Sequence, residues 1–131
     1  MALKRLEAGK RMSSAVIHNG MAYLAGFVAE AAAGKSVKEQ TADILQQIDA
    51  TLKAAGTSKT NIVKANIWLT DIKTWAEMNE AWDAWVVPGQ TPARATVESK
   101  LAAPGLSVES AAVMDNGVVV KGIAPDALKF P

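Results

Sequence analysis

The sequence contains no cysteine and only one histidine, His18, and these shortages exclude several kinds of chemistry. Without cysteine the chain has no disulfide, no thiolate nucleophile and no cysteine-based metal site. A single histidine does not make a metal site without further nitrogen or sulfur ligands, so we expect no bound metal. His18 is followed by Asn19 and Gly20, a pair typical of hairpin turns, and we interpret it as a turn residue.

A strong charge of one sign and long apolar runs are also missing. The formal net charge is +1, and no run of lysine or arginine exceeds a pair. Nucleic-acid binding requires a basic face, so we expect no nucleic-acid partner. No apolar run approaches the roughly 20 residues that span a membrane, and residues 1–7 contain no apolar segment of the secretory type. We therefore expect a cytoplasmic protein without a membrane partner.

Hydrophobic residues make up half of the 131 positions, which is enough for a core. No linker or repeat divides the chain, and we expect one domain spanning residues 1–131. Ser36 with Glu39 three residues later is typical of the start of a helix, and Gly56 of its end. A second helix is expected after Asp71, and its apolar residues at helical spacing predict core packing: Trp75, Met78, Trp82 and Trp85.

Alternating apolar and polar residues predict the strands. They are expected at 3–6, 14–18, 21–28, 62–69, 107–114 and 118–120, with a turn at Asn116-Gly117 and a further strand that opens at Arg94. This order of elements predicts an α+β domain in which both helices pack on one face of a single mixed sheet.

Arg94 stands out because it opens a strand directly after a loop rich in proline and glycine, residues 87–92. Each proline fixes φ and lacks an amide donor, so this loop is neither a helix nor a central strand. The guanidinium is therefore expected at a rigid strand mouth, where its planar fork can bind a carboxylate through two hydrogen bonds. From this segment alone, a solvated surface arginine is the simpler interpretation.

Six segments in order resemble the Rid (YjgF) family of reactive-intermediate deaminases, formerly described as endoribonuclease L-PSP. Residues 91–98, Thr-Pro-Ala-Arg-Ala-Thr-Val-Glu, are similar to the family signature P-x-R-x-x-V/F-E. The other similar segments lie at residues 11–16, 22–28, 40–41, 54–71 and 77–80. The resemblance runs over nearly the whole chain and implies a chorismate-mutase-like fold assembled as a homotrimer.

The resemblance also implies a function without a cofactor. It implies that Arg94 binds the carboxylate of an imine or enamine acid, or of a 2-oxo acid product, in a cleft between subunits. The backbone near Gly26 and Thr96 would frame the reacting carbon, and an ordered water would release ammonia. Binding the carboxylate fixes the adjacent C=N bond for attack.

This sequence departs from the family at the position expected to activate water. Aligning Glu109 with the first glutamate of the family's V-x-E-I/V-E-A strand places Ala111 where the second glutamate stands. A methyl group does not accept a proton, so general-base help from position 111 is lost. Glu109, two residues away, is a possible auxiliary group, and its simpler interpretation is a solvated residue at the sheet edge.

Three further differences predict a more apolar pocket with fewer hydrogen-bond donors. Met12 stands where the family commonly has tyrosine, Ala25 where it has serine and Thr96 where many members have cysteine. Glu98 is interpreted as a structural charge. Asp71 and Asn79 are interpreted as residues that form capping and loop hydrogen bonds.

These departures leave three functional hypotheses. The first is a deaminase of imine or enamine carboxylates, with a pathway-specific deaminase of aminomuconate type as one variant. The second is a module that binds a carboxylate metabolite without turnover. The third is the ribonuclease or translation-inhibitor activity ascribed to some relatives, which the near-neutral charge disfavours.

Overall fold

The computed structural model describes residues 3–113, with side chains described as far as Glu109. Its strands form one mixed sheet in the order β1-β2-β3-β7-β5-β6, with β4 beside β7. Only the β5–β6 pair is parallel among the pairs of the described region, and the others are antiparallel. The strands are β1 (Lys4–Leu6), β2 (Ala15–His18), β3 (Met21–Leu24), β4 (Phe27–Val28), β5 (Lys64–Leu69), β6 (Ala93–Glu98) and β7 (Val108–Val113).

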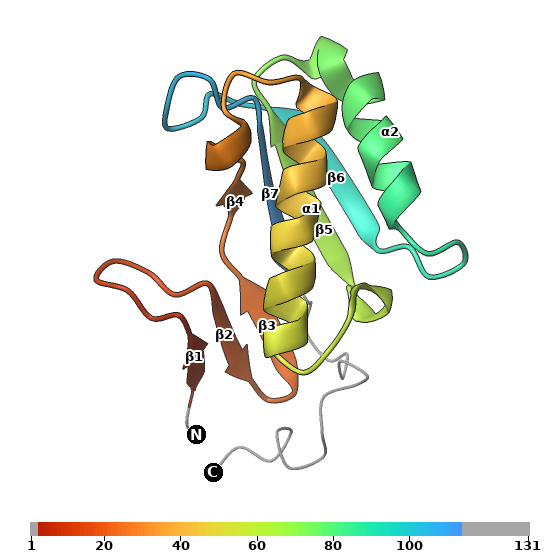
Figure 1. Cartoon of the computed structure of the whole chain (residues 1–131). Coiled ribbons are helices and arrows are strands. Elements are labelled where there is room, and N and C mark those ends of the chain that lie inside the picture. Colours follow the sequence, from red (N-terminus) through yellow and green to blue (C-terminus); the bar gives the residue numbers. More distant parts are fainter. Residues whose placement is uncertain (1–2, 114–131) are drawn as a thin grey trace.

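Two helices lie side by side on one face of this sheet, as Figure 1 shows. They are α1 (Val37–Ala54) and α2 (Trp75–Trp85), and three short 3₁₀ turns accompany them: η1 (Glu30–Ala32), η2 (Lys59–Asn61) and η3 (Ile72–Thr74). The predicted α+β fold with two helices and a mixed sheet is confirmed. The predicted turn at residues 116–117 and strand at 118–120 lie outside the described residues.

The first helix forms as its sequence predicts. The Ser36 hydroxyl accepts a hydrogen bond from the Glu39 amide at 3.1 Å, and Gly56 ends the helix with a φ of 86°. One face of α1 is fully buried, including Ile44, Ile48 and Leu52, and packs in the same core cluster as the inward side chains of β5. This packing fixes the sheet on which the candidate site is built.

The second helix differs from the prediction at its start. Asp71 caps η3 instead, because its Oδ1 accepts a hydrogen bond from the Lys73 amide at 2.9 Å, and α2 begins only at Trp75. Met78 and Trp82 are buried as predicted, but Trp75 is 50% exposed. Side chains of a helix lean towards its N-terminus, so the indole of the first residue extends beyond the helix and leaves the core.

The strand expected over residues 21–28 is interrupted. Four residue steps separate Tyr23 from Phe27, whereas three separate their partners on β7, Val113 and Ser110. One extra residue therefore lies on the β3–β4 side, as in a β-bulge. The Ala25 amide turns away from β7 and donates to the Ser14 carbonyl at 2.9 Å. The break falls at Ala25 and Gly26, two of the expected binding residues.

Candidate functional site

The register of β6 decides which of its side chains face the helices. Arg94 pairs with Ala65 and Thr96 with Ile67, and both partners are buried in the core beneath the helices. The side chains of Arg94 and Thr96 therefore face the helix layer. Val97, which alternates with them, is 48% exposed on the open face of the sheet.

Three residues of α2 orient the Arg94 side chain. Nη1 donates to Oδ1 of Asn79 at 2.8 Å and contacts the sulfur of Met78 at 3.9 Å. The guanidinium carbon lies 5.1 Å from the centre of the Trp82 ring, a cation–π distance. In the region the structure describes, no carboxylate oxygen lies within 4.0 Å of Arg94. The guanidinium is thus oriented, and none of the described residues forms an ion pair with it.

Burial lowers the pKa of Arg94 from its ordinary value, and the negative charge of Asp83 acts in the opposite direction. Arginine ionises so far above neutral pH that the group stays charged. A partly desolvated cation gains more from an incoming anion than a fully hydrated one, because the local dielectric constant is lower. The surroundings of Arg94 therefore favour binding of a carboxylate.

The loop before β6 is rigid, as the prolines predict. The Gln90 amide donates to the Val87 carbonyl at 2.9 Å, and Gly89 has a φ of 82° after Pro88. This is the arrangement of a type II turn, which favours proline and then glycine at its two central positions. The Ala93 amide then bonds to the Val63 carbonyl at 3.0 Å and fixes the start of the strand next to Arg94.

Asn79 is a site residue that the sequence interpretation missed. The expected capping or loop role is wrong, because Asn79 lies inside α2 and accepts the Arg94 hydrogen bond. A signal was present in the sequence. Asn79 and Trp82 are three residues apart and share one helix face, and that face must cover the strand that follows the helix. Glu98, by contrast, has a structural role, since its carboxylate accepts from the Ile72 amide at 3.0 Å.

A second group of expected residues meets on the other side of the sheet. A methyl group added to Gly26 would lie 2.5 Å from Oε2 of Glu109, so the glutamate side chain occupies the space over this glycine. Glu109 is half-buried on β7, which lies between β5 and the β3–β4 segment. The interpretation of Glu109 as a solvated edge residue is therefore wrong. Glycine at position 26 permits this close approach.

Arg94 and Glu109 lie on opposite faces of the sheet. Glu109 pairs with Trp68, the strand neighbour of Ile67, and successive residues of a strand face opposite ways. Ala111 is described by its register, opposite Asn66 and two positions beyond Glu109. The expected site residues therefore do not form one cluster within one copy of the chain.

A cavity of about 600 Å³ brings Gly26 together with two other expected residues, Met12 and Ala25. Neither Arg94 nor Thr96 lines it. Its wall also contains apolar groups and three carboxylates. The carboxylates belong to Glu7, Glu30 and Asp43.

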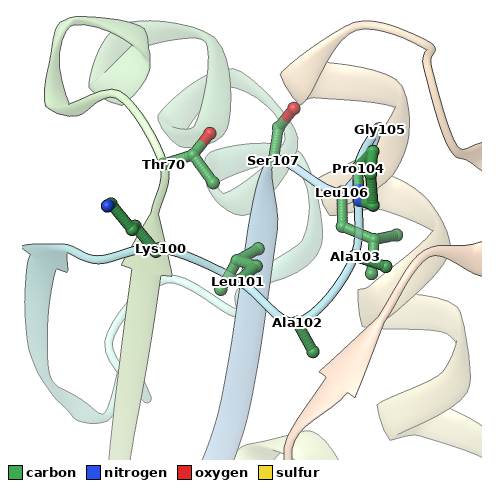
Figure 2. A pocket seen from close by; sticks show the side chains of 9 residues that line it. All are labelled: Thr70, Lys100, Leu101, Ala102, Ala103, Pro104, Gly105, Leu106 and Ser107. Carbon is green, nitrogen blue, oxygen red and sulfur yellow. The ribbon is translucent and has the colours of Figure 1, made fainter.

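Another hollow, of about 520 Å³, lies along residues 100–107 beside Thr70 (Figure 2). Among the described residues that line it, Lys100 is the only ionisable one, and no expected site residue is among them. The loop is held by Gln40, which is fully buried in α1. Its Nε2 donates to the carbonyls of Lys35 at 3.0 Å and Gly105 at 2.9 Å, and its Oε1 accepts from the Ser107 amide at 2.8 Å. We interpret this hollow as a loop surface and not as the reaction site.

Within the described part of the chain, no cluster of three or more histidine, aspartate or glutamate side chains is placed to hold a metal ion. No helix there is both long enough and apolar enough to cross a membrane. The candidate site thus consists of an oriented arginine, a glutamate beside a glycine, and an adjoining cavity.

Comparisons with known proteins give the family. The family model described as endoribonuclease L-PSP matches residues 2–114. RutC family proteins of Haemophilus influenzae and Escherichia coli are each 44% identical over 109 residues, which cover 83% of this chain and 94% of theirs.

Solved structures agree with this assignment. A YjgF family protein from Neisseria meningitidis has a TM-score of 0.82 and 43% identity, covering 89% of this chain and 98% of that one. A Rid family protein of unknown function from Yersinia pestis has a TM-score of 0.77 at 28% identity, covering 86% of this chain and 98% of that one. Sequence and fold together confirm the resemblance drawn from the six segments, and this chain belongs to the Rid family, also called the YjgF or L-PSP family.

Proposed function

We propose that this protein hydrolyses small imine or enamine carboxylates to 2-oxo acids and ammonia without a cofactor. The observation that carries the proposal is Arg94, a partly buried guanidinium that is oriented by Asn79 and Trp82 and forms no ion pair with a carboxylate of the described residues. Arginine in this state binds a planar carboxylate through two parallel hydrogen bonds. Membership of the Rid family supports the choice of substrate.

Arg94 anchors the substrate, and the reaction also needs a separate group that accepts a proton. With the carboxylate bound to Arg94, water adds to the carbon of the neighbouring C=N bond, and one of its protons passes through the acceptor to the imine nitrogen to give a carbinolamine. The carbinolamine hydroxyl then passes its proton through the same acceptor to the nitrogen, the C–N bond breaks, and ammonia and the 2-oxo acid are released. Among the two candidate positions on β7, only Glu109 carries a group that accepts and returns this proton. Its carboxylate lies against Gly26, where the resemblance expects the ligand.

A complete site requires two copies of the chain in this proposal. Arg94 and Glu109 face opposite sides of one sheet, so one copy does not direct both at the same substrate atom. Arg94 lies on β6, the last strand in the order of the described strands, and is only partly buried, so this proposal makes it available to a neighbouring copy. We infer that Arg94 of one copy faces the Gly26–Glu109 region of the next, in the homotrimer that the resemblance implies.

Binding without turnover is the second candidate, and Ala111 is the observation that favours it. If the reaction depends on a proton acceptor at position 111, a methyl group leaves an arginine site that binds a 2-oxo acid and releases it unchanged. Ribonuclease activity, which the family description names, is weaker. The contacts of Arg94 in the described residues are an amide, a thioether and an indole, with the charge of Asp83 nearby, and they include no histidine or lysine to act as an acid–base pair on RNA.

The test measures 2-oxo acid release from imino acids generated in place by an amino-acid oxidase, with semicarbazide as the competing trap. Wild type is expected to accelerate release, and Arg94→Ala and Glu109→Gln are expected to fall to the uncatalysed rate. Arg5→Ala, which removes an exposed arginine on β1, is the control and should match wild type. Full activity in Arg94→Ala would refute the proposal. An inactive wild type that is stabilised by 2-oxo acids and gains turnover as Ala111→Glu would establish the binding module.

A further inference from the structure

Thr96 carries a polar atom whose role the proposed reaction does not explain. Its Oγ1 is buried and has no hydrogen-bond partner in the described structure. A buried hydroxyl without a partner is uncommon in folded proteins, because water that solvated it in the unfolded chain is lost without replacement. Such a group needs a reason to persist, and valine would fill nearly the same volume without the cost.

The position of Thr96 relative to Arg94 supplies that reason. Both residues face the helix layer from β6, two positions apart, which corresponds to about 6.6 Å along a strand. Thr96 as a whole is only half-buried, and β6 is the last strand in the sheet order. Rotation about its Cα–Cβ bond exchanges the hydroxyl with the methyl group and turns the oxygen without moving the backbone.

We propose that the Thr96 hydroxyl binds a hydroxyl group on the side chain of the substrate, so that the site selects hydroxylated imino and 2-oxo acids over apolar ones. This inference rests on the proposed function, because it takes Arg94 as the anchor for the carboxylate. A short acid with a hydroxyl at the far end of its chain presents both groups to this one face of β6, where the carboxylate anchor and the Thr96 side chain lie. The pocket predicted to be more apolar from the substitutions at positions 12, 25 and 96 would then still select a polar side chain.

The threonine hydroxyl both donates and accepts, so it pairs with a substrate hydroxyl in either direction. An apolar chain at the same place leaves Oγ1 without a partner, as it is in the free protein. A site with a buried polar group therefore rejects the analogue that lacks the matching group. The energetic difference is one neutral hydrogen bond, which corresponds to a difference of about tenfold in Kd.

The experiment compares two ligands of nearly equal size, 4-hydroxy-2-oxobutanoate and 2-oxopentanoate, which differ by a hydroxyl in place of a methyl group. Their Kd values are measured by isothermal titration calorimetry with wild type, Thr96→Val, Thr96→Ser and Arg94→Ala. Wild type and Thr96→Ser are expected to bind the hydroxylated acid about tenfold more tightly, and the ratio should approach one in Thr96→Val. Thr96→Val should also unfold at a higher urea concentration than wild type, because it removes the unpartnered hydroxyl.

Three results would overturn the inference. Equal affinity of wild type for the two acids, with both lost in Arg94→Ala, would refute selection by Thr96 and leave the carboxylate site intact. A preference that survives in Thr96→Val would place the hydroxyl recognition elsewhere. Binding of neither acid to wild type would refute the proposed carboxylate site, and this inference with it.

Discussion

Gly26→Ala separates the function of the site from the stability of the fold. The new methyl group would lie 2.5 Å from Oε2, 3.1 Å from Cδ and 3.4 Å from Cγ of Glu109, and no backbone atom is among these neighbours. The carboxylate sits at the far end of a flexible side chain, so it moves aside while the backbone stays in place. The variant thus displaces one functional group from its position over residue 26.

The expected loss of stability is small. Gly26 is not among the glycines with positive φ in the described residues, so alanine fits its backbone conformation without strain. Replacing glycine by alanine stabilises a protein by about 0.4–1 kcal/mol through the unfolded chain, which offsets a rotamer change of similar size in Glu109. The free energy of unfolding should therefore stay within about 1 kcal/mol of wild type.

The expected loss of activity is large. Misplacing a general base removes its contribution of about 10²–10⁴ in rate, so Gly26→Ala should approach the activity of Glu109→Gln. Urea unfolding followed by tryptophan fluorescence gives the stability, and imine hydrolysis gives the rate. Gly34→Ala is the control: its φ of 82° and open surroundings predict a loss of about 1–2 kcal/mol in stability. That control should keep its activity.

The reasoning would be refuted by Gly26→Ala with unchanged turnover, because the carboxylate over residue 26 would then have no part in the reaction. A loss of stability above about 3 kcal/mol would refute it differently, since it would mean that the Glu109 side chain is rigidly fixed and not free to move.

Three further variants test the fold and the anchor. Gln40→Leu leaves two loop carbonyls and an amide without their partners and should lower the free energy of urea unfolding by about 2–4 kcal/mol. Gln46→Leu, at an exposed position, should change it little, and equal effects of the two variants would contradict the role of Gln40 in holding the loop. Arg94→Lys keeps the charge but loses the planar fork, so the Kd for 2-oxo acids should rise about tenfold, and an unchanged Kd would exclude a bidentate contact. Trp85→Phe loses the 2.9 Å hydrogen bond from the indole to Asp49 on α1 and should lower the free energy of unfolding by about 1 kcal/mol. Trp75→Phe, at an exposed position, should lower it less, and the reverse order would show that Trp75 is the core residue.

Local signals predicted most of the fold. The cap at Ser36, the stop at Gly56 and the strand expected at 62–69, which the structure has as β5 over 64–69, follow from side-chain periodicity and from the conformational freedom of glycine, which act over a few residues. The bulge at positions 25 and 26 did not follow, because it depends on the register of β4 against a strand more than 80 residues later. Such a register is set by long-range packing and leaves no mark on the alternation of one strand.

For the candidate site too, local sequence signals were interpreted correctly and contacts between distant elements were not. The Arg94 segment indicated a carboxylate anchor, since the loop prolines and the arginine are neighbours in sequence. The partner Asn79 was misassigned because its contact crosses from α2 to β6. Glu109 was misplaced at an edge because the strand order cannot be read from one segment; in the structure β7 is an inner strand. Interactions between elements decided each of these cases.

The central claim is that Arg94 of one copy and Glu109 of another act on the same substrate, and complementation between subunits tests it most directly. Arg94→Ala and Glu109→Gln are purified separately, mixed in equal amounts, unfolded together and reassembled, and imine hydrolysis is then measured. Each variant alone should be inactive. In the mixture about a quarter of the sites would combine an intact Arg94 with an intact Glu109, so activity should return to about a quarter of wild type. No recovery in reassembled mixed oligomers would contradict a site shared between copies.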